Sequence, residues 1–136
     1  MRECESHYRN EEFRMNENGV KTHKDLEIWK LGIEMVEYVY KITAAFPREE
    51  QFGLISQMRR CSVSIPSNIA EGAARQSIKE YIQFLYVSLG SLSELDTHFE
   101  ISRRLKFTDT SEFIEMIEKL RRKLLNFIKH CKGKLS

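Results

Sequence analysis

The sequence predicts an all-α protein, an up-down-up-down antiparallel four-helix bundle with a proline kink in its second helix. Apolar residues recur every three or four positions in four long segments, which is the spacing of one helix face. The chain has only two prolines and six glycines among 136 residues, which leaves little for β-turns. Short connections between the segments favour antiparallel neighbours. The length fits one domain, which we place at residues 24–136.

Residues 1–23 differ from the rest of the chain. Their charged side chains lie among Asn, Ser and His, and Tyr8, Phe13 and Met15 have neither helical nor strand spacing. Such a segment cannot bury enough apolar area to offset its ordering entropy. We therefore expect a disordered or weakly ordered tail. The alternative is an arm that orders against a neighbouring subunit.

The first predicted helix runs from about Lys24 to Ala45 and carries two apolar stripes. The first stripe is Leu26, Trp29, Ile33, Val36, Tyr40 and Thr43. The second is Ile28, Leu31, Met35, Val39, Ile42 and Phe46. Two stripes cover two faces, whereas a monomeric bundle needs one. The surplus indicates a subunit interface, and Pro47 ends the helix.

The second predicted helix runs from about Glu49 to Ala74 and passes through Pro66. Its apolar stripe continues on both sides of this proline: Leu54, Met58, Cys61, Ile65 and Ile69. Proline removes one backbone hydrogen bond and its ring presses on the preceding turn. An unbroken stripe around it therefore predicts one kinked helix, and the Ser62 and Ser64 hydroxyls are candidates to bond the loosened backbone.

The third predicted helix opens at a capping box formed by Ser77 and Glu80 and ends near Leu105. Its expected core stripe is Ile78, Tyr81, Leu85, Ser88, Leu92, Leu95 and Phe99. Gly90 lies in its middle. Because glycine weakens a helix interior, we expect Gly90 to permit a close approach between helices.

The fourth predicted helix is capped by Asp109 with Glu112 three residues later. Its expected core stripe is Phe113, Ile117, Leu120, Leu124, Ile128 and Cys131, broadened by Leu125. The lysines at its end suit the negative pole of the helix dipole.

Five stretches of this chain resemble one family. They are Arg60–Gly72 (RCSVSIPSNIAEG), Ser77–Tyr81, Leu89–Thr97, Leu26–Lys30 and Phe46–Leu54. Together they resemble the small bacterial four-helix-bundle proteins encoded in intervening sequences of 23S ribosomal RNA genes, over about residues 24–132. Cys61 stands where alanine is more common in that family, and His98 where glutamine is common. The resemblance implies the bundle and no settled activity.

The resemblance also reaches the accessory proteins of diversity-generating retroelements. Those look like the same bundle, form pentameric barrels, and bind nucleic acid and a reverse transcriptase through basic surfaces. The implied partners are therefore further copies of this chain, in a homopentamer, with RNA or DNA and a reverse transcriptase or other protein as candidates.

Three cysteines, Cys4, Cys61 and Cys131, are odd in number and far apart. A secreted disulfide framework needs an even set, so the reducing cytoplasm is the expected location. Cys61 and Cys131 fit small core residues. No signal peptide is recognisable, and no apolar run approaches the roughly 18 residues of a membrane span, so we expect no membrane association.

Two kinds of chemistry were weighed against a structural role. Glu94 and His98 stand four residues apart rather than the three of a di-iron bundle, and the fourth helix has no matching pair, so we expect no metal and no cofactor. Glu71 and Glu94 could converge with Asn68 and Ser91 for acid–base work. We favour a structural polar network of these four residues, because half-buried polar groups need partners. His98 is expected at an interface or on the surface.

The predicted function rests on a basic surface, and ring assembly with the resemblance to the retroelement accessory proteins favours it over a solvated face. From Arg103 onward the sequence has ten basic residues and four acidic ones. The residues expected to contact phosphates are Arg59, Arg60, Arg103, Arg104, Lys106, Arg121, Arg122, Lys123, Lys129 and Lys132. Such a surface binds nucleic acid without reading its sequence. The sequence thus predicts a non-enzymatic nucleic-acid-binding protein. The alternatives are a solvated face, a protein-interaction scaffold or an accessory protein without nucleic acid, and an enzyme using Glu71 and Glu94.

Overall fold

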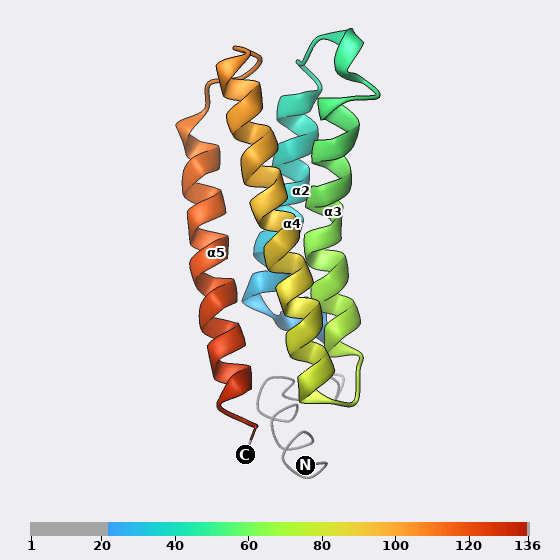
Figure 1. The fold of residues 1–136 in the computed structure, drawn as a ribbon, viewed down its shortest axis with the longest axis vertical. Helices are drawn as coiled ribbons and strands as arrows, with labels where there is room; N and C mark the ends of the chain where they lie inside the picture. The colour runs from blue at the N-terminus through green and yellow to red at the C-terminus, as the bar shows by residue number, and fades with distance from the viewer. Residues whose placement is uncertain (1–21, 136) are drawn as a thin grey trace.

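A computed structural model describes residues 22–135, and within that range the chain is all-helical without a strand (Figure 1). Its long helices are α2 (Glu27–Thr43), α3 (Leu54–Ala73), α4 (Ile78–Arg104) and α5 (Ser111–Lys132), with 3-10 turns η1 (His23–Asp25) and η2 (Arg48–Glu50). Each helix packs on the next along the chain, and α5 closes on α2. The predicted four-helix bundle is confirmed. The predicted tail, apart from Thr22 and His23, lies outside the described residues.

The chain enters the bundle through η1 rather than directly through a helix at Lys24. The Thr22 hydroxyl accepts a bond from the Lys24 N–H, and an Asp25 carboxylate oxygen accepts one from the Thr22 N–H at 2.9 Å. This reciprocal cap closes a short turn, so α2 begins only at Glu27.

The second of the two predicted stripes on α2 faces the core. Ile28, Met35 and Val39 are buried, whereas Trp29, Ile33 and Val36 of the first stripe are only partly covered. Tyr40 keeps 44% of its surface exposed. The first stripe is therefore largely surplus to the core of one subunit. Among all its members, Leu26 and Thr43 alone are buried.

One continuous helix, α3, passes through Pro66 as predicted, while the bend there stays a prediction. Pro66 is buried against α2, where a Cβ on Gly32 would lie 3.3 Å from the proline Cβ. The predicted start at Glu49 is wrong, because η2 intervenes. The N-cap of α3 is Gly53, and a Glu50 carboxylate oxygen accepts a hydrogen bond at 3.1 Å from the N–H of Leu54, the first residue of the helix.

The predicted capping and core stripe of α4 are confirmed. Ser77 Oγ accepts a bond from the Glu80 N–H, and every predicted core residue of this helix is buried. The role expected for Gly90 is wrong: it is exposed, and a Cβ there would meet no atom within 4 Å. The close approach lies at Gly72 instead, where a Cβ would come within 2.8 Å of the Phe84 Cβ.

The core stripe of α5 is confirmed, but two details differ. Thr110, not Asp109, is the N-cap, and its hydroxyl accepts from the Phe113 N–H at 3.3 Å while contacting Tyr38 Oη at 2.6 Å. Leu125 does not broaden the core, since it is 45% exposed. Cys61 and Cys131 are both buried, as predicted, and Cys61 is a free thiol. Within residues 22–135, no helix combines the length and apolar content needed to cross a membrane.

Candidate nucleic-acid interface

Arg59 is a clamp between helices rather than an open phosphate contact. Its Nε donates to Thr43 Oγ1 at 3.0 Å, at the end of α2. Its guanidinium also lies 4.4 Å from the centre of the Tyr40 ring, within cation–π range. A phosphate would have to displace these contacts.

Three of the predicted phosphate contacts on α5 also bridge to other helices. Arg121 Nη2 donates to Asp96 on α4 at 3.1 Å, and its Nη1 pairs with Glu118 at 2.7 Å. Lys123 and Lys132 bridge likewise, to Glu27 on α2 at 3.1 Å and to Tyr86 Oη on α4 at 2.6 Å. All three side chains tie α5 to its neighbours, and carboxylates neutralise Arg121 and Lys123 there.

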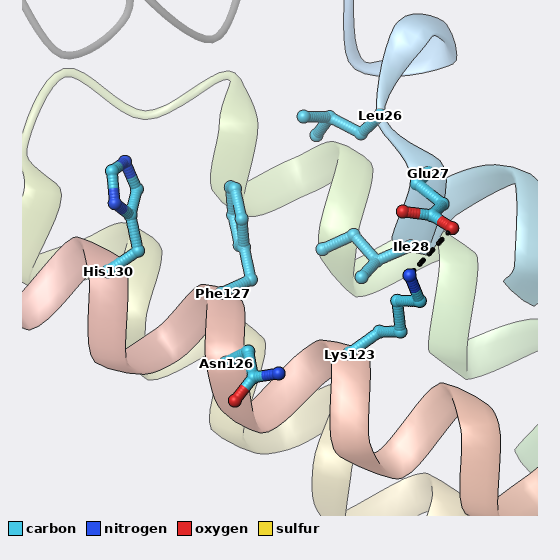
Figure 2. Close-up of a pocket in the computed structure, with 7 residues that line it drawn as sticks. All are labelled: Leu26, Glu27, Ile28, Lys123, Asn126, Phe127 and His130. Carbon is cyan, nitrogen blue, oxygen red and sulfur yellow. Dashed lines mark ion pairs between the residues drawn. The ribbon is translucent and has the colours of Figure 1, made fainter.

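A hollow of about 360 Å³ lies between α5 and the start of α2. Figure 2 shows Phe127 and Lys123 on α5 opposite Leu26 and Ile28, with the Lys123–Glu27 ion pair at one side. Its single lysine already has a carboxylate partner, so the hollow offers an anion little. It is not the best candidate for a phosphate.

A second hollow, of about 470 Å³, lies where α4 turns towards α5, and we call it the basic corner. Its lining residues are Glu100, Arg103, Arg104, Lys106, Thr108 and Asp109. Glu100 accepts from both arginines at 3.2 Å, so three cations share two carboxylates. The corner thus gathers three of the predicted cations into one place with one positive charge in excess.

Lys106 adopts a backbone conformation that favours glycine. Its φ is 64°, the only positive φ of a non-glycine residue among the described ones. The Lys106 N–H bonds to the Arg103 carbonyl and the Phe107 N–H to the Ser102 carbonyl, both at 2.9 Å. This is a Schellman helix end, where glycine is usual at the left-handed position. The strain of a side chain there is about 1–2 kcal/mol.

Four of the ten predicted cations make neither an ion pair nor a side-chain hydrogen bond with any residue from 22 to 135. They are Arg60, Lys106, Arg122 and Lys129, and all are exposed. Lys106 belongs to the basic corner, whereas Arg60 lies on α3 and Arg122 and Lys129 lie along α5. Fewer cations are therefore available to contact phosphate than the sequence indicates.

The predicted polar network assembles only in part. Ser64 Oγ lies 2.8 Å from Ser91 Oγ, and Asn68 Nδ2 donates to the Ser64 carbonyl and hydroxyl at 2.8 and 2.9 Å. We call these three residues the serine–asparagine network. Glu71 is not part of it, because it is exposed and pairs with Arg75 at 3.3 Å. Glu94 is likewise absent and lies 3.3 Å from His98.

Cys61 joins Glu94 and His98, an arrangement that sequence reasoning missed. One ligand atom from each residue lies within 4.8 Å of the other two, and we call this set the Cys–Glu–His cluster. Burial, and then the Glu94 charge, raise the pKa of the Cys61 thiol from 9.0 to about 12. The protonated thiol is a poor nucleophile at neutral pH.

A sequence signal for this cluster exists in the antiparallel register of α3 and α4. In antiparallel helices, a step of three residues along one helix corresponds to a step of three residues back along the other. If Ser64 on α3 lies opposite Ser91 on α4, then Cys61 lies opposite Glu94. The contact between Ser64 and Ser91 fixes that register. Placing the turn before Ser77 would therefore have brought Cys61 and Glu94 together.

The chain matches the model of the 23S rRNA-intervening sequence protein family over residues 24–127. It is also similar to a crystal structure of a protein of unknown function from the S23 ribosomal protein family of Bacteroides thetaiotaomicron. That likeness has a TM-score of 0.65 and 21% identity, covers 75% of this chain and 95% of that one, and shows the fold alone. No curated protein matches. Because the family model covers most of the chain, the protein belongs to the 23S rRNA-intervening sequence protein family.

Proposed function

We propose that this protein is a non-enzymatic, cytoplasmic, homo-oligomeric bundle that binds the phosphate backbone of RNA or DNA through the basic corner. The observation that carries the proposal is Lys106, which holds a charged side chain at a backbone position where glycine would cost less. Strain kept in this way is a reason to look for function. Cys61, a buried free thiol, supports a reducing compartment.

The contacts of the basic residues refine the set that meets phosphate. Arg59, Arg121, Lys123 and Lys132 bridge helices and contribute to the fold. The remaining candidates are Arg60, Arg103, Arg104, Lys106, Arg122 and Lys129. Arg103 and Arg104 share Glu100, so each can turn to a phosphate while the other keeps the carboxylate. Binding of this kind is sensitive to salt and nearly indifferent to sequence.

Self-assembly is supported by apolar side chains that the core of one subunit leaves uncovered. Phe52 is 92% exposed and Val63 41% exposed, and both line a hollow of about 480 Å³ with Tyr40 and Ile55. A neighbouring copy would cover this surface, and the resemblance to pentameric barrels gives the subunit number that we propose. Repeating the basic corner around a ring would add weak contacts together.

The same apolar surface favours a second candidate function. A scaffold or an accessory protein, for example to a reverse transcriptase, would use Phe52 and Val63 to bind a different protein and would need no nucleic acid. The two functions differ in what the purified protein does alone. Only the first predicts retention on nucleic acid and a defined oligomer without a partner.

The experiment compares Lys106→Gly with wild type by fluorescence anisotropy on a labelled single-stranded RNA and a DNA duplex. The variant relieves backbone strain, so we expect it to unfold at higher urea concentration and to bind about 3- to 10-fold more weakly. Arg104→Glu should weaken binding further. Lys79→Glu, an exposed lysine at the opposite end of α4, is the control and should bind nearly as wild type.

Two results would contradict nucleic-acid binding at the corner. The first is no binding at 50 mM salt, and the second is equal weakening by Lys106→Gly and Lys79→Glu. The oligomer is tested separately by light scattering coupled to gel filtration. Phe52→Glu should lower the mass, and a wild-type protein that elutes as a monomer would overturn the assembly.

A further inference from the structure

We propose that Cys61, Glu94 and His98 form a binding site for a divalent transition metal ion, with zinc as the expected ion. A thiolate, an imidazole and a carboxylate are the three protein ligands that zinc accepts, and three such ligands leave one position for water. Calcium and magnesium prefer oxygen ligands alone, so a site with sulfur and nitrogen discriminates against them. Among residues 22–135 no other group of three or more such side chains comes together in this way.

The spacing of the three ligand atoms suits one small ion. Ligands around a tetrahedral zinc ion lie about 3.3–3.6 Å apart, given metal–ligand bonds of roughly 2.0–2.3 Å. His98 Nε2 and a Glu94 carboxylate oxygen are already 3.3 Å apart. The Cys61 sulfur lies within 4.8 Å of its two partners, so side-chain movement of about 1 Å completes the set.

His98 gives the second observation. Its Nε2 faces the Glu94 carboxylate, whereas its Nδ1 is buried and has no hydrogen-bond partner among residues 22–135. A neutral imidazole that donates from Nε2 therefore carries a bare lone pair on Nδ1 inside the protein. Buried polar atoms without partners are rare and need an explanation. An ion bound by Nε2 would replace the Glu94–His98 hydrogen bond and leave the ring proton on Nδ1, so the ligand atom of His98 is Nε2. The unpartnered Nδ1 shows that no other described group already holds this ring.

The environment of the thiol is consistent with a metal ligand that loads from solvent. Half of the Glu94 side chain is exposed, at 51%, and His98 keeps 20%, so an ion can reach Cys61 from outside the bundle. As the metal–sulfur bond forms, the Cys61 S–H bond breaks and its proton leaves to water or buffer. The cation also neutralises the Glu94 charge that otherwise opposes the thiolate.

Such a site would link α3 to α4 near their midpoints. Cys61 belongs to α3, and Glu94 and His98 are one turn apart on α4. A ligand that binds only the folded chain stabilises it by an amount that grows with the logarithm of its concentration over its dissociation constant. Zinc should therefore raise the melting temperature of the protein, and a thermal unfolding curve measures this without any assay of activity.

The experiment uses the full chain with Cys4→Ser, which removes a cysteine outside the described residues. After chelator treatment the protein is titrated with Co²⁺, and we expect one equivalent to produce a sulfur-to-cobalt charge-transfer band in the near ultraviolet. Zn²⁺ should displace the cobalt and bleach the band. Cys61→Ala should abolish the band, whereas Cys131→Ala, which removes the other buried thiol, should keep it.

His98→Gln and Glu94→Gln are partly exposed changes that leave the core intact, so they test the site without relying on Cys61→Ala folding. Each should weaken Zn²⁺ binding at least 10-fold in competition with a chromophoric chelator, while the exposed His130→Gln control should not. The proposal is overturned by a dissociation constant above 100 μM for wild type. It is equally overturned by a cobalt band that survives Cys61→Ala, or by wild-type affinity in both His98→Gln and Glu94→Gln.

Discussion

Two polar groups of side chains lie one helical turn apart between α3 and α4, and they differ in how far their bonding is complete. In the serine–asparagine network, Ser64 contacts Ser91 and receives two bonds from Asn68. In the Cys–Glu–His cluster, Glu94 and His98 face each other near a buried thiol, and one imidazole nitrogen has no hydrogen-bond partner in the described part of the chain.

The difference teaches what each group can do. A network that uses its donors and acceptors internally fixes two helices but has nothing left for a ligand. A cluster with a bare nitrogen and a neutral thiol stabilises the fold less and keeps its capacity for a cation. The same pair of helices thus supports a structural contact and a candidate site side by side.

The largest expected effect comes from separating the two helices that carry both groups. In Gly72→Val the new side chain would meet Phe84 and Tyr81, whose atoms lie 2.8 and 3.0 Å from the position of a Cβ. We expect a loss of about 2–3 kcal/mol in the free energy of unfolding, measured in urea. Metal binding at the Cys–Glu–His cluster should weaken as well.

Gly90→Ala is the matched control on α4, because a Cβ there enters open space. It should raise the free energy of unfolding by about 0.5–1 kcal/mol through helix propensity alone. If both glycine variants are equally stable, the close contact of α3 with α4 at Gly72 is wrong.

The next largest effect is expected in the serine–asparagine network. Asn68→Ala removes the two hydrogen bonds to Ser64, at 2.8 and 2.9 Å, and we expect a cost of about 1–2 kcal/mol. Thr97→Ala removes an exposed hydroxyl that bonds only the carbonyl one turn back, so it should cost under about 0.5 kcal/mol. Equal costs would remove the distinction between the network and an ordinary surface polar group.

Alkaline pH probes the incomplete cluster through Cys61. The pKa of its thiol is raised from 9.0 to about 12 in the folded protein, so the unfolded chain loses this proton first as pH rises. The Cys61 thiol therefore makes its full contribution to the free energy of unfolding below pH 9, and this contribution is lost progressively between pH 9 and 12. At pH 10 the wild type should have lost about 1 kcal/mol more than Cys61→Ala, relative to pH 8. Parallel losses in the two proteins would mean that the thiol pKa is not raised.

Most of the fold follows from periodicity, and the candidate sites follow from it less well. The core stripes of α4 and α5 are local patterns, so each could be read within one helix. The predicted cap of α5 is one residue off, at Asp109 instead of Thr110, because neighbouring polar residues compete for the same role. Gly90 shows the limit of composition: a glycine inside a helix does not reveal whether another helix lies against it.

The sites depend on pairings that a single helix does not show. Arg59 and Arg121 look like free cations in the sequence, but their partners Thr43 and Asp96 belong to other helices. Glu94 and His98 were recognised as a pair, yet Cys61 is added only by the register of α3 on α4. The positive φ of Lys106 is likewise set by the helix end, which the sequence does not mark with glycine.

The smallest expected effect is also the one that separates the two groups most cleanly. In protein kept in chelator, Glu94→Gln and His98→Gln should each change the free energy of unfolding by less than about 0.5 kcal/mol. The hydrogen bond that they break is partly exposed and 3.3 Å long, and exposed polar pairs of this kind contribute little. With Zn²⁺ present, the wild type alone should gain stability. A loss above about 1 kcal/mol in chelator would instead make the Glu94–His98 pair a structural contact comparable to the serine–asparagine network, because a contact that already stabilises the metal-free fold has no need of an ion.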